Sequence, residues 1–313
     1  MRKYLSVTLL ALCVVTTGLT AAANAQASDG VSVQDDMGNT VTLAQPAQRI
    51  VSLAPNITEM LFAAGAGDKV VGTVEFSDYP AWAKRIPRIG RHNALDLERI
   101  ISLKPDLVIA WDSGNPKHQV QRLQQLGLTV FRSEPRHLSN IADTLRHFGQ
   151  LADTPLQAEA SARQFMQRYR MLMAQYQHRP LISVFYQIWD QPLMTLNGKH
   201  MVSEVIELCG GDNVFADLPT LSPTVSTEAV IAANPQVIIA VTAGKNPPAS
   251  LRHWRQWPQL PAVQHDNLFV IEADIINRDT PRILDGMKRM CELLDEAREH
   301  DRDNDNSDND SER

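Results

Sequence analysis

A pattern of a short helix followed by a strand occurs twice in this chain, and it constrains the fold more than any other feature. Residues 97–111 read LERIISLKPDLVIAW, and residues 226–241 read STEAVIAANPQVIIAV. In each copy an amphipathic segment starts at or close to a Glu, stops near a Pro, and is followed by an apolar run typical of a buried strand. The copies lie too far apart for a solenoid, whose repeats recur roughly every 20–50 residues. The pattern therefore predicts two similar α/β units.

The first 25 residues have the composition of a cleaved signal peptide. A basic start and an apolar run over residues 5–15 are followed by small residues ending at Ala25. This run is shorter than the roughly 20 residues that a membrane-spanning helix needs. Lipidation at Cys13 is disfavoured, because the bulky Leu12 precedes it. We therefore expect residues 1–25 to be removed and the protein to be exported; the family resemblance described below implies that it is periplasmic.

The remaining chain divides into two lobes and a connecting helix. Strand and helix signals alternate over residues 26–152 and again over 179–296, which predicts two α/β lobes with mainly parallel sheets. Residues 153–178 contain no Gly or Pro after Pro155 and carry apolar side chains at helical spacing. We interpret them as one long spine helix that joins the lobes. The alternative is an ordinary surface helix of one domain.

The end of the chain is strongly acidic. Residues 297–313 hold almost no apolar side chain, so we expect a disordered acidic tail. The formal net charge of the chain is −6, and the acidic end accounts for most of it. The folded body is therefore nearly neutral and lacks the basic surface of a nucleic-acid-binding protein. We expect a monomer.

Catalytic and metal-binding motifs are missing from the sequence. It contains no GxSxG, no phosphate-binding Gly loop, no HExxH and no CxxC, and its histidines are scattered. We expect no enzymatic activity, no cofactor and no metal site, with an exported hydrolase as the alternative from another class. Cys209 and Cys291 remain after signal removal; in an oxidising compartment they either form a disulfide or stay two buried thiols.

Aromatic and polar side chains follow several predicted strands, at the edge where open α/β sheets bind ligands. Trp111 could instead pack in the core rather than bind a ligand. Asp274 and Arg278 could instead form a local salt bridge with each other. The candidate ligand-binding residues are Phe76, His92, Trp111, Gln187, Trp189, Asp274 and Arg278.

Several stretches resemble the periplasmic cobalamin-binding proteins of ABC importers, a branch of the wider group that carries ferric siderophores and haem. The resemblance covers about residues 49–294, and is carried by APAQRIVSLAPNITEMLFAAGAGDKVVG, EFSDYP, LERIISLKPDLVIAW, VFYQIWDQPLMT, ELCGGDNVF and DTPRILDGMKRMCELL. It implies the class III periplasmic-binding fold, a cobalamin or related corrinoid held between the lobes, and a Cys209–Cys291 disulfide. Haem or a ferric siderophore is the alternative ligand.

Some candidate ligand-binding residues are identical to those of the family, and others are replaced. Trp111, Asp274 and Arg278 coincide with residues of the best-known member, whereas Phe76 and His92 replace a Tyr and a Trp. A direct contact of His92 with the ligand's metal is one hypothesis, and a plain residue at the cleft mouth is the other.

Each copy of the repeated pattern places a Glu at the start of a helix. Glu98 and Glu228 suit this position, because the helix dipole favours a carboxylate there by about 0.3–1 kcal/mol. The resemblance implies a second role, in which the two carboxylates dock onto arginines of a two-fold symmetric inner-membrane ABC permease.

Overall fold

The computed structural model describes residues 30–242 and 249–311. The predicted signal peptide lies outside the described residues. Within the described part of the chain, no helix is both long and apolar enough to cross a membrane.

The N-terminal lobe is built on a four-stranded parallel sheet with the order β4-β3-β7-β8. Helices connect the sheet strands in this lobe, and the antiparallel hairpins β1–β2 and β5–β6 lie beside the sheet. The elements are β1 (Val31–Gln34), β2 (Thr40–Leu43), β3 (Ile50–Ser52), α1 (Pro55–Ala63), β4 (Val70–Thr73), β5 (Gly90–Arg91), β6 (Ala94–Leu95), α2 (Leu97–Ser102), β7 (Leu107–Trp111), α3 (Lys117–Gln125), β8 (Val130–Ser133) and α4 (Asn140–Leu151).

The C-terminal lobe repeats this plan with the parallel order β12-β9-β13-β14. Numbered along each lobe, both sheets have the strand order 2-1-3-4. The elements are β9 (Ile182–Gln187), β10 (Trp189–Asp190), β11 (Leu193–Met194), α6 (Met201–Leu208), β12 (Gly211–Asn213), α7 (Thr227–Ala233), β13 (Val237–Thr242), α8 (Ala249–His253), α9 (Pro261–Gln264), β14 (Leu268–Glu272), α10 (Ala273–Ile276) and α11 (Ile283–Ser311).

The repeated sequence pattern occupies the same place in both lobes. Helix α2 leads into β7, and helix α7 leads into β13. Each of these strands lies inside its sheet, between the first and the fourth strand of its lobe. Both are buried over their first four residues, which explains why their sequences are continuous apolar runs. The prediction of two similar parallel α/β lobes is confirmed.

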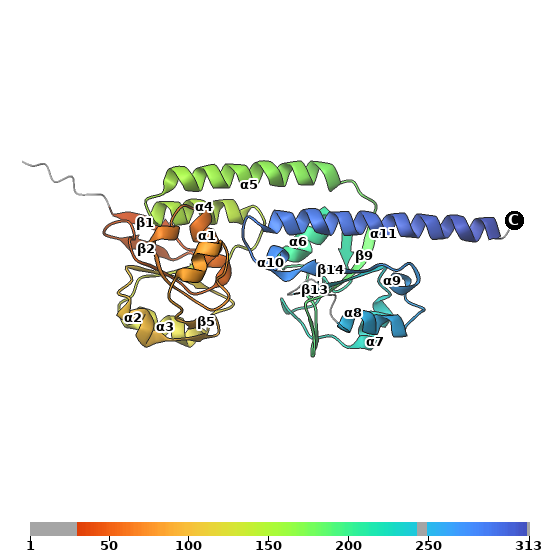
Figure 1. Cartoon of the computed structure of the whole chain (residues 1–313), viewed down its shortest axis with the longest axis horizontal. Helices are drawn as coiled ribbons and strands as arrows, with labels where there is room; N and C mark the ends of the chain where they lie inside the picture. Colours follow the sequence, from red (N-terminus) through yellow and green to blue (C-terminus); the bar gives the residue numbers. More distant parts are fainter. Residues whose placement is uncertain (1–29, 243–248, 312–313) are drawn as a thin grey trace, which may run out of the picture.

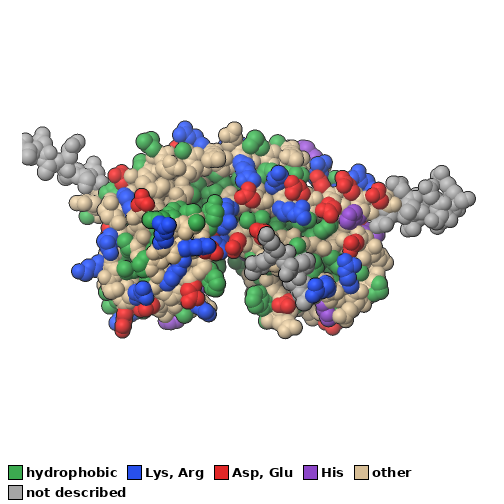
Figure 2. All heavy atoms as spheres, viewed as in Figure 1, with side chains coloured by type: hydrophobic (Ala, Val, Ile, Leu, Met, Phe, Trp, Pro, Cys, Tyr) green, Lys and Arg blue, Asp and Glu red, His purple; other side chains and the backbone are tan. Residues whose placement is uncertain are grey.

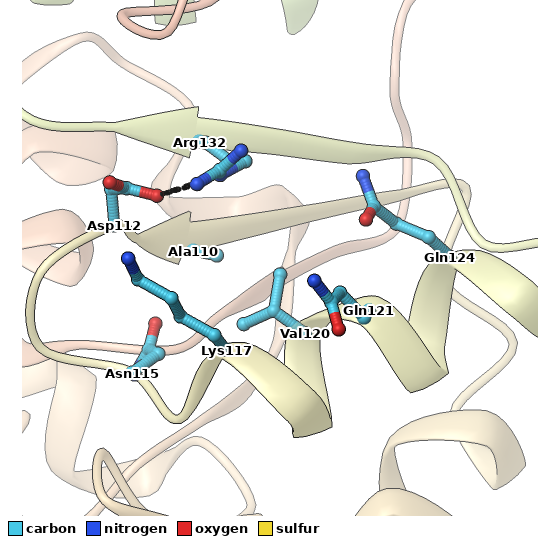
Figure 3. A pocket seen from close by; sticks show the side chains of 8 residues that line it. All are labelled: Ala110, Asp112, Asn115, Lys117, Val120, Gln121, Gln124 and Arg132. Carbon is cyan, nitrogen blue, oxygen red and sulfur yellow. Dashed lines mark hydrogen bonds and ion pairs between the residues drawn. The ribbon is translucent and has the colours of Figure 1, made fainter.

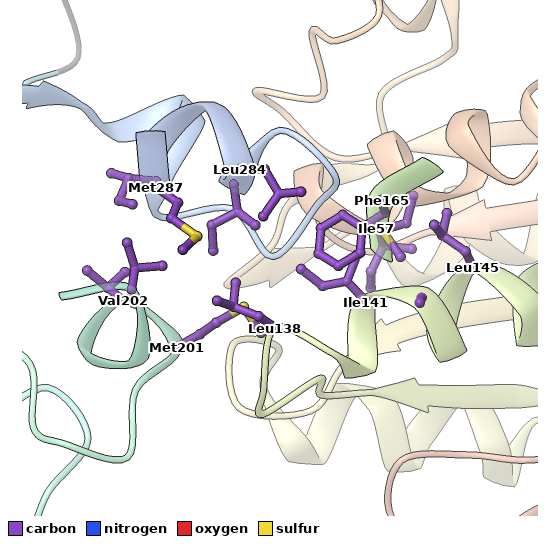
Figure 4. Close-up of a cluster of buried hydrophobic side chains, with 14 of the residues drawn as sticks. Ile57, Leu138, Ile141, Leu145, Phe165, Met201, Val202, Leu284 and Met287 are labelled. Atoms are coloured by element: carbon purple, nitrogen blue, oxygen red, sulfur yellow. The ribbon is translucent and has the colours of Figure 1, made fainter. Parts of the chain in front are cut away.

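Helix α5 (Pro155–Tyr176) connects the two lobes and extends over both of them (Figure 1). Its buried face, which includes Phe165 and Leu172, belongs to an apolar core shared by the two lobes. Figure 4 shows this core continuing from Ile141 and Leu138 in the N-terminal lobe to Met201 and Leu284 in the C-terminal lobe. The lobes are therefore joined by packed side chains as well as by the helix.

The last helix extends into the segment for which the sequence predicts a disordered acidic tail. The acidic segment over residues 297–313 was expected to be disordered, but α11 remains helical through Ser311. Ala297 is fully buried, and Arg298 donates hydrogen bonds to the carbonyl oxygens of Pro180, Cys209 and Gly210 at 2.9–3.0 Å. Composition alone missed these contacts, because an arginine that reaches backbone carbonyls looks like any other charged residue in a sequence.

Cys209 and Cys291 form a disulfide. The bond ties the end of α6 to α11, and both residues are fully buried. The pair of buried thiols is excluded.

Candidate functional site

The surface is hollowed between the two lobes (Figure 2). A pocket in this cleft is lined from the N-terminal side by the turns that follow β7 and β8, and from the C-terminal side by the start of α6 and the segment before α11. Its residues are Trp111, Ser113, Glu134, Pro135, Arg136, Lys199, His200, Met201, Leu221 and Asp279. The carboxyl edge of the N-terminal sheet thus faces the opposite lobe, as open α/β sheets place their ligand sites.

Two of the predicted ligand-binding residues meet at this edge. The rings of Trp111 and His92 lie 5.9 Å apart between centroids and are tilted by 43°. Trp111 ends strand β7, and His92 lies at the tip of the β5–β6 hairpin. Trp111 also packs against the shared core, which is the alternative role considered for it.

A buried carboxylate joins the two lobes beneath the cleft. Glu59 of α1 is 2% exposed in its side chain, and its Oε1 accepts from Arg278 Nη1 at 2.6 Å. Arg282 donates to both carboxylate oxygens of Glu59, at 2.7 and 2.9 Å. Its guanidinium also lies 3.9 Å above the ring of Tyr79. Two arginines of the C-terminal lobe are thus held by one glutamate of the N-terminal lobe.

Arg278 reaches further residues from this position. Its guanidinium pairs with Asp274 at 2.8 Å and with Asp78 at 3.2 Å. The Asp274 contact is the local salt bridge weighed as the alternative for these residues. Arg278 Nη2 also donates to the carbonyl of Phe76 at 3.4 Å.

Phe76 is exposed and conformationally restrained. Its side chain is 65% exposed, and its backbone φ of 66° lies in the left-handed region that bulky residues rarely adopt. Such a conformation persists only when the surroundings impose it, and Arg278 provides one such contact at the Phe76 carbonyl.

The remaining two predicted residues lie apart from this group. Gln187 is 3% exposed, and its Oε1 accepts from the indole of Trp254 at 2.9 Å. Trp189 is 60% exposed on the β10–β11 hairpin and donates to the Gln191 carbonyl. Gln187 also lines a separate hollow of the C-terminal lobe with Leu193.

Two titratable groups in the cleft have shifted pKa values. Burial, together with the negative charge of Glu134, raises the pKa of Asp279 from 3.8 to about 7. Burial lowers the pKa of His200 from 6.5 to about 4, and its Nδ1 accepts from the Val202 amide at the start of α6. His200 is therefore neutral at neutral pH.

The described residues contain no group of three or more His, Cys, Asp or Glu side chains arranged to hold a metal ion. Another hollow of the N-terminal lobe lies beside the start of α3, where Arg132 pairs with Asp112 (Figure 3). Asn115 lines this hollow, in the turn before α3.

Glu98 and Glu228 are exposed and occupy the first turns of α2 and α7. Each helix is capped by a side chain that accepts a hydrogen bond from a backbone amide. The capping residue is Asp96 in α2 and Ser226 in α7. Both helices lie on the side of the molecule away from α5 (Figure 1). The hydrogen bonds of its own backbone amide and of Ser226 lower the pKa of Glu228.

Sequence reasoning missed Glu59, Arg282 and Asp279. Glu59 interrupts the apolar sequence PNITEMLFA of α1, and a charge within a buried helix face is a usable signal for a paired group. Asp279 offered no such signal, since its environment depends on Glu134, far away in the sequence.

These features define a two-lobed α/β binding protein with its site between the lobes. The family model described as "Periplasmic binding protein" matches residues 50–275, and the chain belongs to this family. It is a binding protein rather than an enzyme.

Known relatives match most of the chain. The vitamin B12-binding protein of Vibrio cholerae serotype O1 is 42% identical over 250 residues, which cover 80% of this chain and 90% of the relative. The vitamin B12-binding protein of Yersinia pestis is 37% identical over 251 residues, which cover 80% of this chain and 88% of the relative.

Solved structures show the same similarity. The crystal structure of the periplasmic vitamin B12 binding protein of Vibrio cholerae has a TM-score of 0.75 and 40% identity, covering 81% of this chain and 98% of that one. The periplasmic heme-binding protein of Roseiflexus has a TM-score of 0.70 and 25% identity, and the match covers 80% of this chain and 99% of that one.

Proposed function

We propose that this protein captures cobalamin or a related corrinoid between its lobes and delivers it to an ABC-type permease. The observation that carries the proposal is the 42% identity with a vitamin B12-binding protein along 90% of that protein's length. Export through cleavage of residues 1–25, and action as a monomer, belong to the same proposal.

The chemistry of the cleft suits such a ligand. A corrin is a large, partly apolar disc edged with amides, so it needs aromatic surface and a few placed polar groups. Trp111 and His92 offer the rings, and Asp274 offers an exposed carboxylate beside the guanidinium of Arg278. Besides the neutral His200, the ionisable groups of the cleft pocket are Glu134, Asp279, Arg136 and Lys199, and Asp279 is about half ionised at pH 7 because its pKa is about 7. The pocket therefore carries only a small positive charge near neutral pH, which suits a ligand with little net charge.

Haem is the second candidate ligand. It is favoured by the similarity in fold to the heme-binding protein of Roseiflexus. His92 is the side chain at this edge that could reach a metal, although its ring lies against Trp111. Under the corrinoid proposal His92 is a residue of the cleft mouth, and His92→Ala leaves the absorption spectrum of the bound ligand unchanged.

Equilibrium titration decides between these ligands. Purified protein is titrated in parallel with cyanocobalamin, hemin and a ferric siderophore, and tryptophan fluorescence is followed. Saturable binding of cyanocobalamin with the lowest dissociation constant supports the proposal. Sub-micromolar binding of hemin without binding of cyanocobalamin overturns it.

Glu98 and Glu228 are proposed as the contacts with the permease. Their equivalent positions before β7 and β13, their exposure, and their place on one side of the molecule support this role. A two-fold symmetric partner needs the same contact twice.

The docking proposal predicts a separation of binding from transport. Glu98→Ala combined with Glu228→Ala leaves ligand affinity unchanged and strongly reduces uptake in cells or vesicles. The matched control is Glu207→Ala with Glu296→Ala, which removes two other exposed acids. Normal uptake by the Glu98/Glu228 variant would refute the docking role.

A further inference from the structure

We infer that Asn115 is a positioning residue that fixes the aromatic wall of the cleft, because its one side chain fastens three separate segments of the N-terminal lobe. The inference rests on the proposed function only in its ligand: Trp111 and His92 are taken to face a corrinoid. The hydrogen bonds by which Asn115 holds Trp111 and His92 in place do not depend on which ligand is bound.

The hydrogen bonds of Asn115 converge on the carboxyl edge of the sheet. Its Oδ1 accepts from the Trp111 amide at 2.7 Å, and its Nδ2 donates to the carbonyls of Leu53 at 2.9 Å and His92 at 2.7 Å. Leu53 follows β3, Trp111 ends β7, and His92 lies between β5 and β6. Strands β3 and β7 are the neighbours between which the strand order reverses, which is where sheets of this kind bind ligands.

An asparagine suits this place for chemical reasons. The side chain uses one acceptor and both amide hydrogens, which is a combination that aspartate, serine and leucine lack. Asn115 is only 4% exposed, so water is poorly placed to replace the lost partners. Removing the amide would leave buried backbone groups unsatisfied, and the turns would shift to regain partners.

The indole of Trp111 depends on the same turn. A Cβ on Gly114 would lie 1.8 Å from Cε3 of Trp111, so the backbone passes directly against the ring. Asn115 also donates its own backbone amide to the Trp111 carbonyl at 2.9 Å. Any rearrangement of residues 111–115 therefore moves the ring (Figure 3 shows Asn115 in this turn, before α3).

The β5–β6 hairpin is held at two places. Its base is fixed by Glu75, whose amide donates to the Gly90 carbonyl, and by Gln119, which accepts from the Leu95 amide at 3.0 Å. Its tip is fixed at the His92 carbonyl by Asn115. Loss of Asn115 should therefore release His92 while the base of the hairpin stays in place.

The test compares Asn115→Ala with Asn267→Ala in the full-length protein. Asn267 is equally buried and also donates through its amide, but it lies before β14, at the amino edge of the other sheet. We expect Asn115→Ala to raise the dissociation constant for cyanocobalamin about tenfold or more, at temperatures where both variants are folded. Asn267→Ala should leave it within about twofold while lowering the melting temperature similarly.

Two readouts separate positioning from general destabilisation. Amide hydrogen exchange should accelerate at Trp111 in Asn115→Ala and remain slow at Ile109, further inside the same strand. Asn115→Asp should bind cyanocobalamin poorly at pH 8, because its carboxylate would face two carbonyl oxygens. At pH 5 its affinity relative to wild type should recover, because the protonated acid regains one hydrogen-bond donor.

Unchanged cyanocobalamin affinity in Asn115→Ala, or equal losses in both alanine variants, would overturn the inference. If the wild type fails to bind cyanocobalamin, the proposed ligand is wrong. The exchange rates at Trp111 and Ile109 then still decide whether Asn115 positions the wall, because they need no ligand.

Discussion

Glu59 links the two lobes through a buried ion pair with two arginines. It satisfies two arginines at 2.6–2.9 Å while it is almost fully buried. Loss of the carboxylate charge removes the ion pair of Arg282 with Glu59, while Arg278 keeps Asp274 and Asp78. Breaking a buried ion pair by removing one partner typically costs about 3–5 kcal/mol. Glu59→Gln should therefore lower the free energy of unfolding by about 3 kcal/mol, measured by urea denaturation.

The control for Glu59 is an ion pair near the surface. Asp285 and Arg168 pair at 2.6 Å with side chains 48% and 38% exposed, and exposed pairs contribute about 0–1 kcal/mol. Asp285→Asn should have this smaller effect. Equal losses in the two variants would show that Glu59 is not the special contact described above.

Asp279 should make stability depend on pH. Its folded pKa of about 7 exceeds the ordinary value of 3.8, so folding favours the protonated form. The stabilisation is fully present below about pH 4 and is lost as the pH rises through about 7. Asp279→Asn should therefore gain stability relative to wild type between pH 5 and pH 8, by a few kcal/mol at most, since one pKa unit corresponds to about 1.4 kcal/mol.

Urea unfolding at pH 5 and pH 8 checks this expectation for Asp279. Asp212→Asn, at an exposed position, serves as the control and should show no such change. A stability difference between Asp279→Asn and wild type that is the same at both pH values would contradict the account.

Individual residues were only partly predictable. Trp111 could be placed from the sequence, because the carboxyl ends of parallel strands share one edge of the sheet. His92 reaches the same place from the tip of the antiparallel β5–β6 hairpin, which that rule does not cover. Gln187 follows a strand by the same rule, yet its side chain is occupied by Trp254, which approaches from a distant helical turn. A rule based on strand ends locates a backbone position, but it does not reveal which neighbour already uses the side chain.

At the scale of elements, the repeated helix–strand pattern was the most informative feature. Apolar runs in β7 and β13 and the helix starts before them depend on local sequence, so their equivalence was readable. The extent of α11 was not readable, because it depends on the contacts of Arg298 with Pro180 and Cys209. Local composition predicts an element well only where local interactions stabilise it.

Truncation of α11 tests this explanation. A chain ending at Asp303 keeps Ala297 and Arg298. Its free energy of unfolding should lie within about 0.5 kcal/mol of that of the full chain. A chain ending at Glu296 loses both, and should be destabilised by at least about 2 kcal/mol through the lost buried contacts and hydrogen bonds. Equal stability of the two truncated chains, measured by thermal and urea unfolding, would mean that residues 297–303 contribute nothing.

At the scale of the whole molecule, the two lobes share one apolar core under α5. Phe165 and Leu172 of α5 are part of this core. Separate domains commonly unfold in separate steps, whereas a shared core couples them. Calorimetry of the ligand-free protein should therefore show one transition. Two resolved transitions would indicate that the lobes are energetically independent.

The central claim is that the cleft between the lobes binds a corrinoid, and calorimetric titration with cyanocobalamin tests it most directly. The account predicts saturable binding of one molecule per chain, with affinity reduced at least about tenfold by Trp111→Ala, since a large aromatic contact is lost. Absence of binding to the wild type, or binding that Trp111→Ala leaves unchanged, would contradict the account.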